Sequence, residues 1–237
     1  MLLQRAREFT SGPIYTPVGE RGTILLPSAS GGTDWGGGAW DPNSNVMVAS
    51  SNYIAMVVTN IPADQPATGD DASIDISGAM EFANAGSPYR TRAEPLMSPL
   101  GAPCSEPPWA RLTAVDMRTK AILWQVPLGD VSELAPFPIP WELGTPGVGA
   151  PLVTAGGLVF IGYSLDDTFR AFDLSTGEVL WKARLPAPAN LQPQTYWYQG
   201  RQYVVVPAGG HNMFGTEVSR RDGISLAMTY GANSFQV

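Results

Sequence analysis

Apolar residues along the chain occur in short runs, either alternating with polar residues or continuous, and Gly, Pro, Asn and Asp separate the runs. Residues 46–49 and 54–58 are two such runs, and a turn-forming stretch at 41–45 precedes them. Short apolar runs bounded in this way are typical of β-strands. Strand signals return at Arg111 and continue to Tyr230. The pattern predicts an all-β protein.

Residues 60–107 differ from the remainder of the chain. They are rich in Pro, Ala, Ser, Gly and Asp and show little periodicity. A long stretch without secondary structure is usually a loop or an insertion and not part of the core of a compact domain. We therefore expect a long irregular insertion at about 60–107, with one helical turn at most, in a single domain that spans 1–237.

One internal repeat is visible, between residues 112–124 and 169–181. Both copies have an Ala, an Asp two positions later, a Thr three positions after that and a Trp five positions further on. We interpret each copy as a strand that ends at the Asp, a tight turn and a second strand that carries the Trp. Gly177 permits a positive φ in the second turn. Trp124 and Trp181 are predicted to be structural residues packed between sheets.

Two hairpins extend this picture, one around Gly156 and Gly157 and one around residues 199–201. Each is predicted to form the inner pair of strands of a β-propeller blade. The signals add up to about three blades. Because a closed propeller usually has about four to eight blades, the chain is expected to be part of a ring.

The composition excludes several classes of protein. With 26 Gly and 22 Pro among 237 residues, the chain is unsuited to a helix bundle or a coiled coil. The formal net charge is −7 and no basic cluster stands out, so nucleic-acid binding is not expected. The first residues lack the apolar run of a signal peptide, and no stretch is long and apolar enough for a membrane helix.

The single cysteine, Cys104, is interpreted as a buried or loop thiol, with a disulfide to an upstream cysteine left open.

The repeat resembles the tryptophan-docking motif of dehydrogenases that use pyrroloquinoline quinone (PQQ). Residues 31–37, Gly-Gly-Thr-Asp-Trp-Gly-Gly, resemble a Gly-Gly-x-(Asn/Asp)-Trp segment of that family. Residues 101–109, 166–172 and 208–211 resemble segments of the membrane-bound quinoprotein glucose dehydrogenases in particular. The likeness runs from about Ile24 to about Tyr230.

The resemblance implies an eight-bladed propeller with PQQ at its centre, of which this chain is the C-terminal part. The complete enzyme would oxidise glucose or a related sugar or alcohol and pass electrons to ubiquinone. It would lie at the periplasmic face of the bacterial inner membrane and use a divalent cation, Ca or Mg, to hold PQQ. The catalytic Asp, the metal ligands, the remaining blades and the membrane anchor are expected upstream, so no residue here is assigned a catalytic or metal-binding role. The chain alone is expected to be inactive.

Four residues are candidates for the site. The resemblance places Asp34 and Trp35 in the PQQ pocket, and glycines beside them allow close approach of a flat ligand; the alternative is a structural turn. It places Asp166 near PQQ and the electron exit path; the alternative is an Asp in a β-turn. His211, the only histidine, is placed beside the sugar and PQQ as a hydrogen-bond donor or acceptor; the alternative is a surface or capping residue.

Two other functions stay open. One is a PQQ-dependent polyol or quinate dehydrogenase, since such relatives share most of these motifs. The other, from a different class, is a non-catalytic propeller that scaffolds proteins of the bacterial envelope. Such a scaffold would have the Trp repeat but should lack the segments that contain Asp34, Trp35 and His211.

Overall fold

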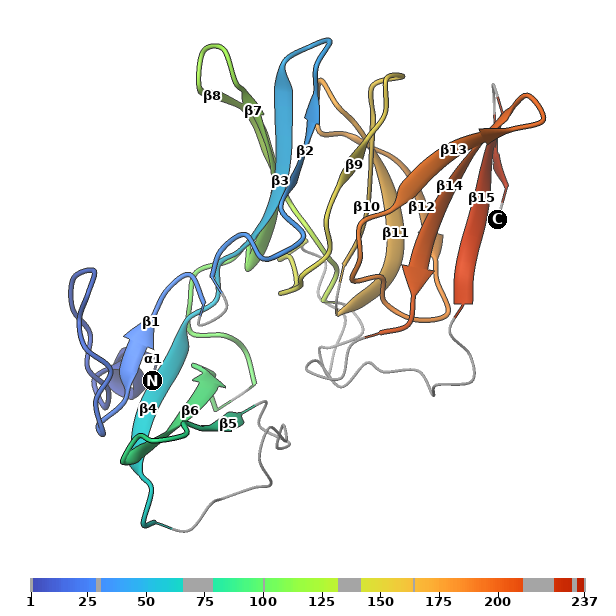
Figure 1. The fold of residues 1–237 in the computed structure, drawn as a ribbon. Coiled ribbons are helices and arrows are strands. Elements are labelled where there is room, and N and C mark those ends of the chain that lie inside the picture. Colours follow the sequence, from blue (N-terminus) through green and yellow to red (C-terminus); the bar gives the residue numbers. More distant parts are fainter. Residues whose placement is uncertain are drawn as a thin grey trace. The chain divides into compact units, whose positions relative to one another are not determined.

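A computed structural model describes residues 2–28, 31–65, 79–99, 101–131, 142–163, 165–210, 224–231 and 234–236. Within these ranges there is one short helix, α1 (Leu2–Ala6), and four sheets, each of four antiparallel strands (Figure 1). The all-β prediction is therefore confirmed. The chain divides into two compact units: unit 1 consists of Met1–Gly32 and Tyr53–Glu106, and unit 2 of Thr33–Asn52 and Pro107–Val237.

Unit 1 contains one sheet with the strand order β1-β4-β6-β5. Its strands are β1 (Thr23–Leu25), β4 (Met56–Pro62), β5 (Met80–Ala83) and β6 (Tyr89–Pro95). Apolar side chains cover both faces of β4, because Val57 belongs to one buried cluster and Val58 to another. This alternation is what a strand with two covered faces requires.

The structure corrects the prediction of an irregular insertion at about 60–107, because β5 and β6 both lie within that segment. Their sequences lack an apolar period for a physical reason. The buried carboxylate of Glu81 on β5 pairs with Arg92 on β6 at 3.3 Å, and Arg92 also pairs with Glu94 at 3.0 Å. Charged side chains therefore occupy positions where the sequence rule expects apolar ones.

Unit 2 contains three sheets. The first has the order β2-β3-β7-β8, the second β12-β11-β10-β9 and the third β13-β14-β15-β16. The strands are β2 (Gly38–Asp41), β3 (Val46–Asn52), β7 (Ala110–Asp116), β8 (Ala121–Pro127), β9 (Leu152–Val153), β10 (Leu158–Tyr163), β11 (Asp166–Asp173), β12 (Val179–Arg184), β13 (Gln194–Tyr198), β14 (Arg201–Ala208), β15 (Ile224–Gly231) and β16 (Ser234–Gln236).

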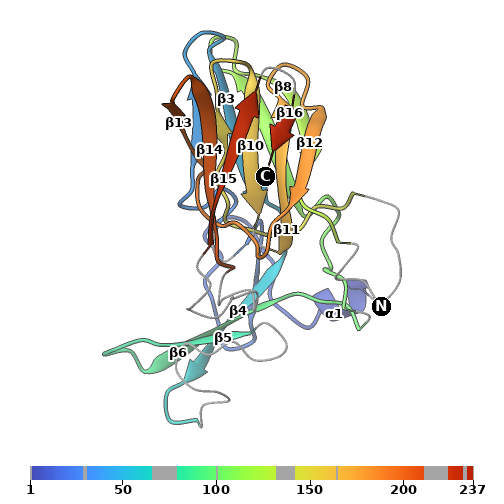
Figure 2. The same ribbon diagram turned by 90° about the vertical axis from the view of Figure 1, so that its right-hand side faces the viewer.

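The three sheets of unit 2 lie side by side in chain order (Figure 1), and their strands overlap when viewed from the side of the third sheet (Figure 2). The second sheet is the middle layer. Val159 and Ile161 of β10 join the apolar cluster shared with the first sheet, whereas Phe160 joins the cluster shared with the third. Because successive side chains of a strand point to opposite faces, one strand supplies both interfaces.

The two copies of the repeat form the same turn. Oδ1 of Asp116 accepts the backbone N–H groups of the residues two and three positions later, at 2.8 and 3.1 Å. Oδ1 of Asp173 does the same at 2.8 and 3.0 Å. The fourth residue after each Asp has a positive φ, +63° at Lys120 and +74° at Gly177. The turn predicted from the sequence is therefore present in both copies.

Trp124 is buried and joins the first sheet to the second. Its Nε1 donates to the backbone carbonyl of Leu174 at 2.8 Å. A Cβ at Gly177 would lie only 2.7 Å from the Trp124 ring. The turn of the second copy thus receives the Trp of the first copy, and only glycine leaves room for the ring.

Candidate functional site

A glycine-rich turn at 33–37 precedes β2 and presents Trp35 to solvent. The N–H of Trp35 donates to Oδ1 of Asp34 at 2.6 Å, and the N–H of Gly37 donates to the carbonyl of Asp34 at 2.9 Å. Gly37 has a φ of +64°, which glycine adopts without steric cost. Trp35 is 69% exposed. The turn therefore holds an indole and a carboxylate side by side at the start of the first sheet.

This turn lies against the segment that leads into the second sheet. A Cβ at Gly36 would be 2.8 Å from the Cβ of Ala150 and 3.0 Å from the carbonyl oxygen of Val148. Tyr163, the last residue of β10, is also nearby. Burial raises the pKa of Tyr163, a hydrogen bond with the Ser50 side chain lowers it, and the negative charge of Asp34 raises it. The site is thus built where three segments of unit 2 meet.

Asp166 lies at the same end of the second sheet, since it is the strand partner of Tyr163. Its carboxylate is fully engaged within the chain. Oδ1 accepts the N–H of Thr168 (2.6 Å) and Oδ2 that of Asp130 (2.6 Å), and Arg170 donates to both oxygens at 3.1 and 2.5 Å. The side chains of Asp166 and Arg170 are only 2% and 6% exposed. Direct contact of Asp166 with a cofactor would require this ion pair to open. The assignment of Asp34, Trp35 and Asp166 as cofactor-binding residues stays a prediction.

His211 lies outside the described residues. The preceding residue, Gly210, is placed: its N–H donates to the carbonyl of Pro188 at 3.0 Å, at the junction of the second and third sheets. The assignment of His211 as a substrate-binding residue stays a prediction.

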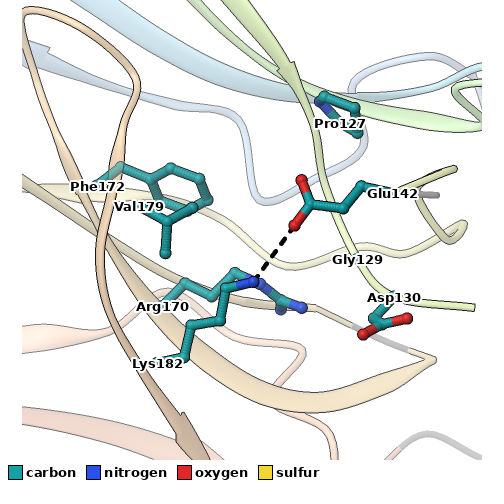
Figure 3. A pocket seen from close by; sticks show the side chains of 8 residues that line it. All are labelled: Pro127, Gly129, Asp130, Glu142, Arg170, Phe172, Val179 and Lys182. Atoms are coloured by element: carbon teal, nitrogen blue, oxygen red, sulfur yellow. Dashed lines mark hydrogen bonds and ion pairs between the residues drawn. The ribbon is translucent and has the colours of Figure 1, made fainter. Parts of the chain in front are cut away.

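A depression in unit 2 is lined by charged residues (Figure 3). Lys182 Nζ pairs with Glu142 Oε1 at 3.4 Å, and Arg170 is already held by Asp166. The lining residues are Pro127, Gly129, Asp130, Glu142, Arg170, Phe172, Val179 and Lys182. Because none of the predicted site residues lines it, this depression is not assigned as the functional site.

Among the residues that the structure describes, no group of three or more His, Cys, Asp or Glu side chains could hold a metal ion. In the same ranges no helix is long and apolar enough to cross a membrane.

The sequence analysis missed three residues around the site, Ser50, Asn52 and Tyr163, which are all buried. One signal could have revealed two of them. Along β3 the buried positions alternate from Val46 through Val48 to Ser50 and Asn52, so the apolar face of the strand becomes polar at its end. A polar residue in the buried phase of a strand needs a hydrogen-bond partner. No comparable signal distinguishes Tyr163 from an ordinary core aromatic.

Comparison with known proteins shows the family to which the chain belongs. The family of the PQQ glucose/ethanol/alcohol dehydrogenase β-propeller domain matches residues 2–204. The chain therefore belongs to the family of PQQ-dependent quinoprotein dehydrogenases, as the sequence resemblance predicted. A solved structure agrees with this fold: the quinohemoprotein alcohol dehydrogenase of Comamonas testosteroni superposes on 84% of this chain and 25% of its own, with a TM-score of 0.56 and 22% identity.

Individual relatives are similar to this chain at moderate identity. The quinoprotein glucose dehydrogenase of Escherichia coli (strain K12) is 36% identical over 215 residues, which cover 86% of this chain and 27% of the relative. A probable quinate dehydrogenase (quinone) of Xanthomonas campestris pv. juglandis is 40% identical over 207 residues, covering 83% of this chain and 26% of that protein. The chain thus spans about a quarter of the length of the curated relatives that it matches.

Proposed function

We propose that this chain forms part of a PQQ-dependent dehydrogenase that oxidises glucose or a related sugar and passes the electrons to ubiquinone. The observation that carries the proposal is the turn at 33–37, where an exposed indole stands beside a carboxylate on a glycine-rich backbone. Family membership supplies the chemistry that such a turn would serve.

The residues of this turn fit a flat, polar, aromatic cofactor. Trp35 offers a ring face on which a planar group can stack. Asp34 keeps one carboxylate oxygen on the N–H of Trp35 and has capacity to accept a hydrogen bond from a ligand at the other. At Gly37 an added Cβ would meet open space, so a ligand can approach the backbone there closely. When bound, PQQ supplies the two-electron acceptor for oxidation of a C–OH group.

The chain's own part in this reaction is orientation. Trp35 and Asp34 would hold one side of the cofactor, while His211 would hydrogen-bond a substrate hydroxyl as donor or acceptor. Asp166, locked to Arg170, would fix the end of the second sheet rather than touch the cofactor. The catalytic Asp, the Ca or Mg site and the membrane anchor would belong to other parts of the complete protein, at the periplasmic face of the inner membrane.

A sugar is the first choice of substrate because residues 101–109, 166–172 and 208–211 resemble the glucose enzymes in particular. Quinate or a polyol is the second candidate, since a quinate enzyme is similar at 40% identity. Both candidates have several hydroxyl groups, which a pocket lined by His211 would have to distinguish. The scaffold alternative receives no support from membership in a dehydrogenase family.

Substitution of Trp35 tests the cofactor site. In the complete dehydrogenase that includes this chain, Trp35→Ala should weaken PQQ binding by up to about tenfold, since a stacking contact is worth about 0.5–1.5 kcal/mol. Affinity would be measured by titrating PQQ and following fluorescence quenching. Trp40→Ala is the matched control, because Trp40, on the strand β2 that follows the turn, is another exposed indole, 57% exposed and bonded to Asn45. Equal affinities for both variants and the wild type would contradict the site.

A further inference from the structure

The backbone at 147–150 supports the turn that carries Asp34 and Trp35. Gly36 lies so close to Val148 and Ala150 that a Cβ on it would collide with both. The segment 147–150 is itself packed closely against β10, because a Cβ on Gly149 would be 2.1 Å from the carbonyl oxygen of Gly162. A small displacement of 147–150 would therefore be passed directly to the turn.

Two side chains of the first sheet hold this segment by its backbone. Asn52 donates from Nδ2 to the carbonyl of Gly147 at 2.8 Å and accepts the N–H of Gly147 on Oδ1 at 2.9 Å. Ser50 donates from Oγ to the carbonyl of Gly149 at 2.9 Å. All three bonds are buried, where they are stronger than in water and costly to lose.

Tyr163 connects this arrangement to the second sheet. Its hydroxyl donates to Oδ1 of Asn52 at 3.1 Å, and the residue is 1% exposed. Burial raises the pKa of Tyr163, a hydrogen bond with the Ser50 side chain opposes that rise and the charge of Asp34 adds to it; the net shift is upward, so the hydroxyl keeps its proton and remains a donor. The Asn52 amide, carried by the first sheet, is thereby bonded both to Tyr163 of the second sheet and to the backbone of Gly147.

We propose that Tyr163 is a positioning residue: by holding Asn52, it fixes the backbone at 147–150 on which the Asp34–Trp35 turn rests, and so tunes ligand affinity at that turn. The effect on ligand affinity rests on the proposed function. The positioning itself does not, since it follows from contacts within unit 2.

Hydrogen–deuterium exchange tests the positioning without any ligand. Tyr163→Phe removes one hydroxyl and little volume, and it should raise amide exchange several-fold in peptides that cover 33–38 and 144–151. Trp124→Phe is the matched control, because it also removes one buried hydrogen bond between the same two sheets, to Leu174. In the strand register Trp124 is level with Val48, four positions before Asn52 on β3, and its replacement should leave both peptides protected.

A double-mutant cycle tests whether the effect passes through Asn52. Asn52→Ala should raise exchange in the same two peptides, and adding Tyr163→Phe to it should have little further effect. If Tyr163→Phe raises exchange no more at these peptides than across the whole of unit 2, its role is general stability and the proposal is wrong. Additive effects of the two substitutions would also overturn it.

PQQ titration of the complete dehydrogenase tests whether the substitution changes ligand affinity. Tyr163→Phe should weaken PQQ binding about three- to tenfold with the turn residues themselves unchanged, whereas Trp124→Phe should not weaken it. If the wild type binds no PQQ, the proposed function fails while the exchange experiment still decides the positioning. If the wild type binds PQQ and Tyr163→Phe binds it equally well, the inference about affinity is overturned.

Discussion

Single residues in this chain show how closely conformational freedom is matched to packing. The two repeat turns share a positive φ at their fourth position, but one has Gly177 and the other Lys120 there. The second turn has glycine at this position because Trp124 packs against Gly177, where a side chain would collide with the Trp124 ring. An L-residue such as Lys120 is tolerated only where no ring docks, and it carries the strain of the left-handed conformation.

This contrast gives a paired prediction. Gly177→Ala should destabilise the protein by about 1–3 kcal/mol, because the new Cβ meets both an unfavourable φ and the Trp124 ring. Lys120→Gly should change stability by less than about 1 kcal/mol, since relief of strain offsets the larger entropy of the unfolded chain. Equilibrium denaturation with urea measures both. A loss for Gly177→Ala no larger than the change for Lys120→Gly would contradict the docking role of the glycine.

Individual residues also mark the limit of sequence reasoning about the site. Asp34 and Trp35 could be selected because glycines surround them and a family motif contains them. The role of Asp166 depends on Arg170, four residues away, and on the N–H of Asp130, and no local pattern shows that these groups close around one carboxylate. The same holds for Tyr163 and Asn52, whose contact spans more than a hundred positions in the chain.

At the scale of elements, the turns between strands depend on ionised aspartates. Asp41, Asp116 and Asp173 each accept hydrogen bonds from residues two and three positions later. Hydrogen bonds of this kind lower the pKa of all three carboxyls. The largest cause is the hydroxyl of Ser44 at Asp41, the hydroxyl of Ser175 at Asp173 and the backbone N–H of Thr119 at Asp116.

The lowered pKa values predict an acid dependence of stability. A carboxyl with a pKa below the ordinary 3.8 in the folded state stabilises the fold above about pH 4 and loses that contribution as pH falls through the folded-state value. Asp173→Asn keeps an oxygen that can accept the same N–H groups but does not titrate. Its thermal midpoint should therefore decrease less than that of the wild type between about pH 5 and pH 2.5. Parallel curves for the two proteins would show that the Asp173 turn does not contribute to this dependence.

Elements of unit 2 were predictable from sequence to the extent that their apolar periods are regular. The hairpins around 156–157 and 199–201 and both repeat turns form as expected. The strands β5 and β6 were missed because Glu81, Arg92 and Glu94 take buried or half-buried positions by pairing with one another. Prediction of strands from alternating apolar and polar residues treats each residue separately. It does not recognise a buried charge that is neutralised by a partner on the neighbouring strand.

At the scale of the whole molecule, the third sheet of unit 2 exposes a group of aromatic side chains. Tyr196 stacks on Tyr203 with ring centroids 5.2 Å apart, and Tyr198 meets Tyr203 edge to face at 6.4 Å. Tyr196 and Tyr198 are largely exposed, as is every residue of β13. Apolar surface of this kind commonly marks a face that another element covers.

We therefore predict that this chain alone does not oxidise glucose, even with PQQ and Ca or Mg added. In the proposed site the turn at 33–37 would supply only one wall, and within the described ranges no group of three or more His, Cys, Asp or Glu side chains could hold the cation. Dye-linked glucose oxidation by the purified chain is the measurement, with the complete dehydrogenase as the positive control. Turnover by the chain that disappears when PQQ is left out would show that the chain suffices.

The central claim is that the complete protein containing this chain is a PQQ-dependent sugar dehydrogenase. The most direct test is dye-linked oxidation by that protein, prepared without cofactor and then reconstituted with PQQ and Ca or Mg, over a panel of glucose, other aldoses, quinate and polyols. The account predicts no turnover before reconstitution, turnover after it, and the highest kcat/KM for glucose or another aldose. Preference for quinate or a polyol would contradict the proposed substrate. Absence of PQQ-dependent turnover with every compound would contradict the proposed function as a whole.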